Sequence, residues 1–188
     1  MKKPLLVLED TSPESRHALF RFGGVTWAAT RYAWLSPMFW AALGAVLAFA
    51  EQRNETVEGA LLVGCGYGLI LYGSNVIHSV GHILAGRVVG APMSTNLLTS
   101  TRDVSVYVQP GASAPRGLRL GRSLGGPLAN MLCGVIALAA GGPESSRWLA
   151  VFGSFNIAVC LWTLTPVPSL DGWVIWGTLF GFDRDRVA

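Results

Sequence analysis

The sequence predicts an all-α, polytopic membrane protein with about four transmembrane helices and a short β-strand or hairpin segment near residues 92–110. The first reason is composition: 51% of the 188 residues are hydrophobic and 13% are charged, whereas a soluble domain carries about 25% charged residues. The second reason is that the chain contains four long stretches without a charged side chain. This composition excludes a disordered protein and argues against an ordinary soluble enzyme.

The uncharged stretches contain 19, 28, 21 and 23 residues and cover 32–50, 59–86, 123–143 and 148–170, and after Asp171 the last one continues without a charge to 182. A helix crosses the hydrocarbon core of a bilayer with about 20 apolar residues, so each stretch is long enough to span. The predicted spans are about 32–50, about 59–86, about 124–141, and a fourth from near Trp148 to Pro166 or beyond.

Lysine and arginine residues alternate between the polar segments of the chain. The N-terminal segment 1–31 contains five, the first loop one, the segment between the second and third spans five, the next loop one and the tail two. The positive-inside rule places the basic segments in the cytoplasm. We therefore predict a multi-pass protein of the cell (plasma) membrane with both termini cytoplasmic.

The segment between the second and third spans has a different texture. Val104–Val108 alternates apolar and polar residues, as a half-exposed strand does, and Pro110-Gly111 is a turn signal. The chain shows no repeat or linker. We therefore predict one integral membrane domain, 1–188, that begins with the polar segment 1–31.

The remaining features of composition favour no other class. The net charge is +3, but the longest basic run is Lys2-Lys3, so a nucleic-acid partner is not expected. Cys65, Cys133 and Cys160 lie in apolar stretches without a CxxC spacing, which is typical of small buried hydrophobes. No cleavable signal peptide is expected, because the first 30 residues are polar and of mixed charge.

Short-spaced glycines within and after the second span indicate close packing of helices. The pairs are Gly64/Gly68 and Gly86/Gly90, and small residues at this spacing let two helix backbones approach each other. Packing is favoured over a ligand-binding role for both pairs.

Three ionisable residues fall inside the predicted spans, where such groups usually serve function. His78 and His82 are four residues apart and share a helix face with Asn75 and Ser79. Asp171 follows the helix-breaking sequence 166–168. Two imidazoles, one carboxylate and a water form a common open zinc site. The alternatives are two neutral histidines hydrogen-bonded across a bundle, and an aspartate that caps a helix or lies at the surface.

Three segments, in order, resemble the site-2 protease type of intramembrane zinc metalloprotease. His78-Ser79-Val80-Gly81-His82 resembles the family's H-E-x-G-H. Gly125-Gly126-Pro127-Leu128-Ala129-Asn130 resembles its A-G-P-x-x-N segment. Pro166-Val167-Pro168-Ser169-Leu170-Asp171-Gly172 resembles the end of N-x-x-P-x-P-x-L-D-G. The similarity implies a metalloprotease-like core over about 59–182.

The resemblance also implies a chemistry. Zn²⁺ would be bound by His78, His82 and Asp171, and a water on the metal would attack a peptide bond of the substrate. The implied partners are the lipid bilayer and a membrane-spanning protein substrate or partner. The strand near Val104–Val108 would align the substrate by edge pairing. The candidates for substrate binding are Asn130 and Thr163. Thr163 stands at the position of the second asparagine in the family pattern.

Two departures from the family pattern matter for function. Ser79 stands where the family has its catalytic glutamate, and Thr163 stands where it has an asparagine. A serine hydroxyl cannot accept a proton near neutral pH, and on a helix Ser79 is expected to bond to the carbonyl of Asn75. Asp103 is the one acidic residue between Glu58 and Glu144, and it is expected in a loop. No replacement base is therefore predicted.

Three hypotheses follow. The first is a zinc-binding but catalytically impaired relative of the protease, which holds membrane-spanning partners. The second is an active intramembrane protease with an unrecognised base, or an engineered knockout of one at Ser79. The third belongs to another class: a small transporter or structural membrane subunit whose His/Asp set relays ions.

Overall fold

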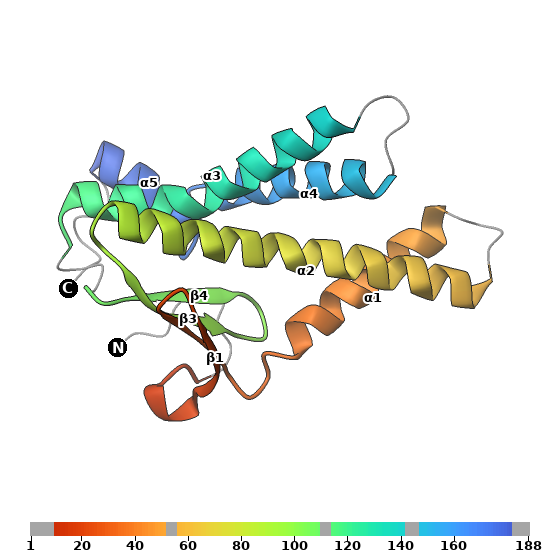
Figure 1. The fold of residues 1–188 in the computed structure, drawn as a ribbon, viewed down its shortest axis with the longest axis horizontal. Coiled ribbons are helices and arrows are strands. Elements are labelled where there is room, and N and C mark those ends of the chain that lie inside the picture. The colour runs from red at the N-terminus through yellow and green to blue at the C-terminus, as the bar shows by residue number, and fades with distance from the viewer. Residues whose placement is uncertain (1–9, 52–55, 110–113, 142–146, 182–188) are drawn as a thin grey trace.

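A computed structural model describes residues 10–51, 56–109, 114–141 and 147–181 as a mostly helical protein with one small sheet (Figure 1). A single 3₁₀ turn, Pro13–Ser15, precedes the first strand. The helices are α1 Leu35–Glu51, α2 Val57–Val88, α3 Arg116–Ala140, α4 Arg147–Thr163 and α5 Asp171–Phe180. Figure 1 shows α2 running through the middle of the molecule, with α3 and α4 on one side and α1 and the sheet on the other.

Two of these helices, α2 and α3, are long and apolar enough to cross a membrane by length and composition. The helices α1 and α4 are apolar but shorter than that criterion. α2 begins at a capped end, where the Thr56 side chain accepts a hydrogen bond from the Gly59 amide at 3.3 Å. It packs against α1, α3 and α4. The four predicted spans therefore coincide with four helices, two of which meet the length expected of a span.

The sheet contains two strands that the sequence analysis did not predict. Its strands are β1 His17–Phe22, β2 Val25–Ala29, β3 Met93–Leu98 and β4 Asp103–Tyr107, in the order β1-β2-β3-β4. The β3-β4 pair is the hairpin predicted near residues 92–110, whereas Pro110-Gly111 lies outside the described residues. The N-terminal segment supplies β1 and β2, so the all-α prediction was wrong in this part of the chain.

The sheet is held against the second half of α2 by an apolar cluster. β2 pairs in parallel with β3 and antiparallel with β1. Val25 and Trp27 of β2 pack with Met93 of β3 and Ile83 of α2, and all four are buried. Ile83 follows His82 directly, so this cluster fixes the sheet beside the histidine pair.

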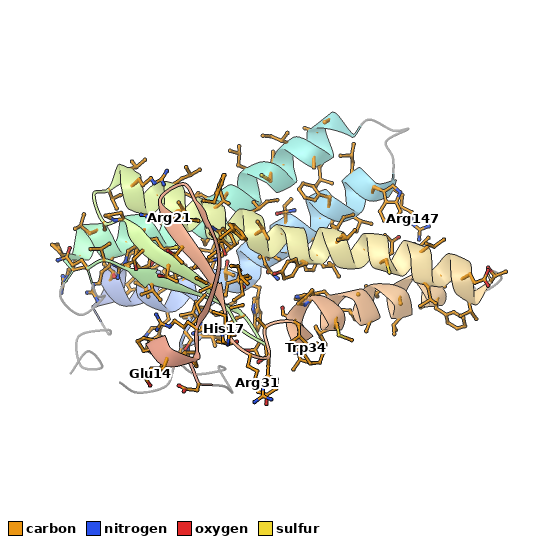
Figure 2. All side chains as sticks on the ribbon, turned by 60° about the horizontal axis from the view of Figure 1, so that its bottom comes forward. Glu14, His17, Arg21, Arg31, Trp34 and Arg147 are labelled. Atoms are coloured by element: carbon orange, nitrogen blue, oxygen red, sulfur yellow. The ribbon has the colours of Figure 1, made fainter. Side chains whose placement is uncertain are left out.

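Charged residues of the N-terminal segment and Arg147, the first residue of α4, lie far apart in the molecule. Figure 2 shows Glu14, His17 and Arg21 at the end that carries the sheet, and Arg147 far from them at the start of α4. This separation agrees with the predicted alternation of polar segments. The orientation of the two ends relative to a membrane stays a prediction.

The two glycine pairs have different surroundings. A Cβ on Gly64 or Gly68 would meet the backbone of α1, at Ala45 and Ala41, which confirms close helix packing for that pair. A Cβ on Gly86 would instead meet the carbonyl of Ala91, just beyond the end of α2. Gly90 has φ +75° and nothing within 4 Å, so the packing prediction was wrong for the second pair, which forms a turn.

Candidate metal centre

The three predicted ligands converge at one point between α2 and α5. The Nε2 atoms of His78 and His82 are 3.0 Å apart. An Oδ2 atom of Asp171 lies 2.9 Å from the first and 3.3 Å from the second. His82 is buried, while the side chains of His78 and Asp171 keep 16% and 18% of their surface exposed. The site is therefore enclosed on the His82 side and accessible to water on the other.

The other ring nitrogen of each histidine has an acceptor. His82 Nδ1 lies 2.8 Å from the Arg122 carbonyl oxygen, which can only accept, so this nitrogen carries a proton. His78 Nδ1 lies 2.7 Å from Asn130 Oδ1. The Asn130 amide donates to the Ser74 carbonyl and to Asn156 Oδ1, which leaves its oxygen to accept from His78. A neutral ring held in this way directs its Nε2 lone pair into the site.

Two Nε2 lone pairs and a carboxylate oxygen that face one another repel unless a metal ion or a proton lies between them. Their ligand atoms fall within 4.8 Å of one another, which is close enough for one ion. Two imidazoles and one carboxylate suit zinc, with a fourth position left for water, and hydrogen bonds from the outer ring nitrogens are the usual support for such ligands. The donor set of this chain fits a zinc ion.

Asp171 reaches the histidines because the chain breaks and turns between α4 and α5. α4 ends at Thr163, and Asp171 is the first residue of α5. Ser169 has φ +80°, and the Arg102 guanidinium donates to its carbonyl. A Cβ on Gly172 would meet the carbonyls of Leu164 and Thr165, so only glycine permits this approach of α5 to the end of α4.

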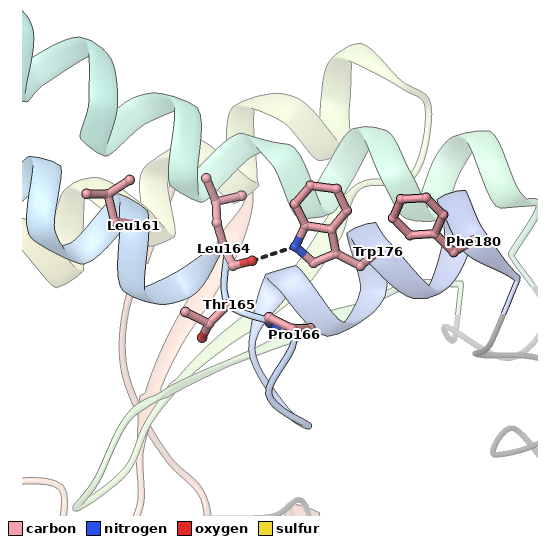
Figure 3. Close-up of a pocket in the computed structure, with 6 residues that line it drawn as sticks. All are labelled: Leu161, Leu164, Thr165, Pro166, Trp176 and Phe180. Atoms are coloured by element: carbon pink, nitrogen blue, oxygen red, sulfur yellow. Dashed lines mark hydrogen bonds between the residues drawn. The ribbon is translucent and has the colours of Figure 1, made fainter.

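A second contact ties α5 to the end of α4. The Trp176 indole donates to the Leu164 carbonyl at 2.7 Å, and both residues line an apolar groove (Figure 3). The groove is lined by Leu161, Leu164, Thr165, Pro166, Trp176 and Phe180. With the Arg102 contact, this bond holds both sides of the loop that presents Asp171.

Gly126 of α3 forms one wall of the site. Its place in the segment 125–130, which resembles the family pattern, did not predict this role. A Cβ on Gly126 would lie 2.5 Å from His78 Cε1 and Nε2 and 2.6 Å from His82 Nε2. The space that a metal needs beside these nitrogens exists because residue 126 has no side chain. A glycine in the segment 125–130 was visible in the sequence, but its position against both rings was not.

The two residues predicted to bind substrate occupy different surroundings. Asn130 is fully buried and uses both ends of its amide on His78, Ser74 and Asn156. Thr163 is half-buried at the end of α4, where its hydroxyl donates to the Cys160 carbonyl at 3.1 Å. The structure gives Asn130 the further task of orienting a ligand ring. Substrate binding by either residue stays a prediction.

Replacing Asn130 by alanine is expected to weaken zinc binding about 10–100-fold, as loss of an outer-shell partner of a metal ligand does. The change removes the acceptor of His78 Nδ1 and leaves the Ser74 carbonyl without its donor. Isothermal titration with zinc measures the effect, and Asn130→Asp, which keeps an acceptor oxygen, is the control. Equal zinc affinity in Asn130→Ala and the unmodified protein would contradict the assignment.

Ser79 does not form the bond expected from the sequence. Its hydroxyl donates to Asp103 Oδ2 at 3.0 Å rather than to the Asn75 carbonyl, because β4 brings a stronger acceptor to this face of α2. Asp103 is the first residue of β4 and not a loop residue. Desolvation raises the pKa of Asp103 to about 6, against the opposing effects of Ser79, Asn96 and His78. The expectation that Asp103 lies in a loop was therefore wrong, because it begins β4 and contacts Ser79.

Comparison with known proteins agrees with this geometry at the level of the fold. No protein-family model and no curated protein matches the sequence. Among solved structures, the chain is similar to the site-2 protease from Methanocaldococcus jannaschii, with a TM-score of 0.62 and 17% sequence identity. The match covers 91% of this chain and 74% of that one. The chain therefore has the fold of a site-2 protease, a membrane metalloprotease-like fold.

Proposed function

We propose that this chain is a multi-pass, zinc-dependent intramembrane metalloprotease of the site-2 protease type, which hydrolyses a peptide bond of a membrane-spanning protein. The observation that carries the proposal is the convergence of His78 Nε2, His82 Nε2 and Asp171 Oδ2 on one point. The fold and the two membrane-length helices support it. The lipid bilayer and the substrate are the expected partners, with both termini on the cytoplasmic side.

The residues of this chain would divide the work as follows. His78, His82 and Asp171 would hold the zinc ion, which when bound lowers the pKa of a water toward neutrality and polarises the substrate carbonyl. Asn130 and the Arg122 carbonyl keep the two rings in the required tautomer. Among the described residues β4 is an edge strand of the sheet, and its outer edge can pair with an extended substrate segment.

Ser79 favours a second candidate function. Without a carboxylate at position 79, the chain would bind zinc and membrane-spanning partners but cleave them slowly, because a general acid–base contributes about 10²–10⁴-fold in rate. This catalytically impaired form shares the metal site and the fold with the first candidate. The two differ only in whether another group handles the proton.

Metal analysis tests the site that both candidates share. The purified protein is expected to contain about one zinc per chain, and His78→Ala, His82→Ala or Asp171→Ala is expected to lose it, because each change removes one of three ligands. His17→Ala is the matched control, since His17 lies exposed on β1. Absence of stoichiometric zinc in the unmodified protein would favour an ion-relaying transporter or structural subunit.

Cleavage of a membrane-anchored substrate in lipid vesicles separates the two candidates. Cleavage that stops on zinc chelation and returns with added zinc is expected for the proposed protease. A protein with full zinc content that leaves several such substrates intact would instead be the impaired form.

A further inference from the structure

A serine and an aspartate, brought together from α2 and β4, lie next to the proposed metal ligands. The Ser79 hydroxyl and Asp103 Oδ2 are 3.0 Å apart, and Ser79 directly follows His78 on α2. Ser79 is buried, with 2% of its surface exposed. Asp103 is half-buried, so the pair joins a buried hydroxyl to a carboxylate at the border of the interior.

The turn of the hairpin just before Asp103 is held by hydrogen bonds. Thr99 accepts from the Arg102 amide at 3.2 Å and donates to the Arg102 carbonyl at 2.6 Å, which closes the turn before β4. The Arg102 side chain reaches Ser169 in the loop that presents Asp171. One hairpin end thus contacts both the ligand loop and the residue between the two histidines.

The carboxylate of Asp103 lies within the reach that a glutamate side chain at position 79 would have. A glutamate extends two bonds beyond the point at which the serine side chain ends. The hydrogen bond from Ser79 spans a similar reach and ends on a carboxylate oxygen of Asp103. The pair thus joins a helix hydroxyl to a strand carboxylate over a reach similar to that of one glutamate side chain.

We propose that Asp103, acting through the Ser79 hydroxyl, takes up and returns the proton in peptide-bond hydrolysis, in place of a glutamate at position 79. The inference rests on the proposed function, because it needs the zinc site and a peptide substrate. It replaces the expectation of an impaired site with a relay of two residues. The sequence positions of Ser79 and Asp103 do not by themselves indicate this role.

The proton balance closes over one cycle. The attacking water gives one proton to Ser79 Oγ while the original hydroxyl proton of Ser79 moves to Asp103 Oδ2, and the water oxygen forms a bond to the substrate carbonyl carbon. When the carbon–nitrogen bond breaks, Asp103 returns its proton to Ser79, and Ser79 passes one to the leaving amine. Ser79 and Asp103 end as they began, and one peptide bond and one water become an acid and an amine.

Four proteins test the relay: the unmodified chain, Asp103→Asn, Ser79→Glu and the swap Ser79→Glu/Asp103→Ser. Asp103→Asn is expected to lower kcat about 10²–10⁴-fold while KM and zinc content stay unchanged. The swap is expected to restore kcat to the level of the unmodified chain, because a single glutamate then takes up and returns the proton. Glu58→Gln, at the exposed start of α2, is the control for loss of a carboxylate elsewhere.

Thermal unfolding of the metal-free proteins gives a readout that needs no activity. Ser79→Glu alone puts two carboxylates in one place and is expected to lower Tm. Adding Asp103→Ser to it is expected to raise Tm again, since the second charge is removed. Additive effects of the two changes on Tm would show that a glutamate at 79 does not reach Asp103, and would overturn the inference.

The kinetic outcomes separate this inference from the proposed function. Unchanged kcat in Asp103→Asn, or an inactive unmodified protein beside an active swap variant, overturns the relay and leaves the protease site standing. Loss of zinc in Asp103→Asn also overturns it, because the residue would then be structural. Full zinc content without cleavage by any of the four proteins overturns the proposed protease function itself.

Discussion

Replacing Gly126 by alanine is expected to abolish zinc binding while the helices stay folded. The added Cβ would lie 2.5 Å from His78 Nε2 and 2.6 Å from His82 Nε2, well inside the separation of unbonded carbon and nitrogen atoms. These nitrogens can move away only by rotating out of the position in which they face Asp171. The methyl group would then occupy the space of the ion itself. Zinc content per chain, measured on purified protein, is expected to fall from about one to near zero.

Gly117→Ala is the matched control for this experiment. Gly117 lies on the same helix, α3, and a Cβ there would have nothing within 4 Å, so zinc content is expected to stay the same. Circular dichroism of both variants checks that helix content is retained. Full zinc content in Gly126→Ala would place the metal away from the two Nε2 atoms and would contradict the proposed centre.

The convergence of the three proposed metal ligands could be predicted from sequence because their signals are local. His78 and His82 are one helical turn apart, so helix geometry alone puts them on one face. Asp171 was matched by the surrounding 166–172 segment, whose prolines also predicted the break before α5. What no local signal contained was the tautomer of each ring, which depends on Asn130 and on the Arg122 carbonyl of α3.

Asp103 shows why the rest could not be predicted. Its separation from Ser79 is 24 residues, and their contact depends on how the β3-β4 hairpin lies against α2. That placement depends in turn on β2, which pairs with β3 in parallel across α1 and α2. β1 and β2 were not predicted from the sequence. Every residue of β1 is exposed, so no alternation of apolar and polar residues marks this strand. Sheet pairings between distant segments are set by the folded helices and not by a nearby motif.

Gly81→Ala is expected to destabilise the protein strongly, because Gly81 lies where α2 contacts α3. A Cβ on Gly81 would meet the carbonyl oxygen of Gly125 and the Ala129 methyl, and a Cβ on Gly125 would meet Gly81 in return. Because the obstruction is backbone, a change of side-chain rotamer cannot relieve it. Overpacking of this kind costs about 1–3 kcal/mol, and the expected result is a lower midpoint of thermal unfolding in detergent micelles.

Gly73→Ala on the same helix is the matched control, and its effect is expected to have the opposite sign. A Cβ on Gly73 has nothing within 4 Å, so alanine there gains helix preference of about 0.5–1 kcal/mol without a clash. A stabilised or unaltered Gly81→Ala would mean that α2 and α3 can separate at no cost. In that case Gly126 would not be held against His78 and His82, because the same contact of α2 with α3 places it there.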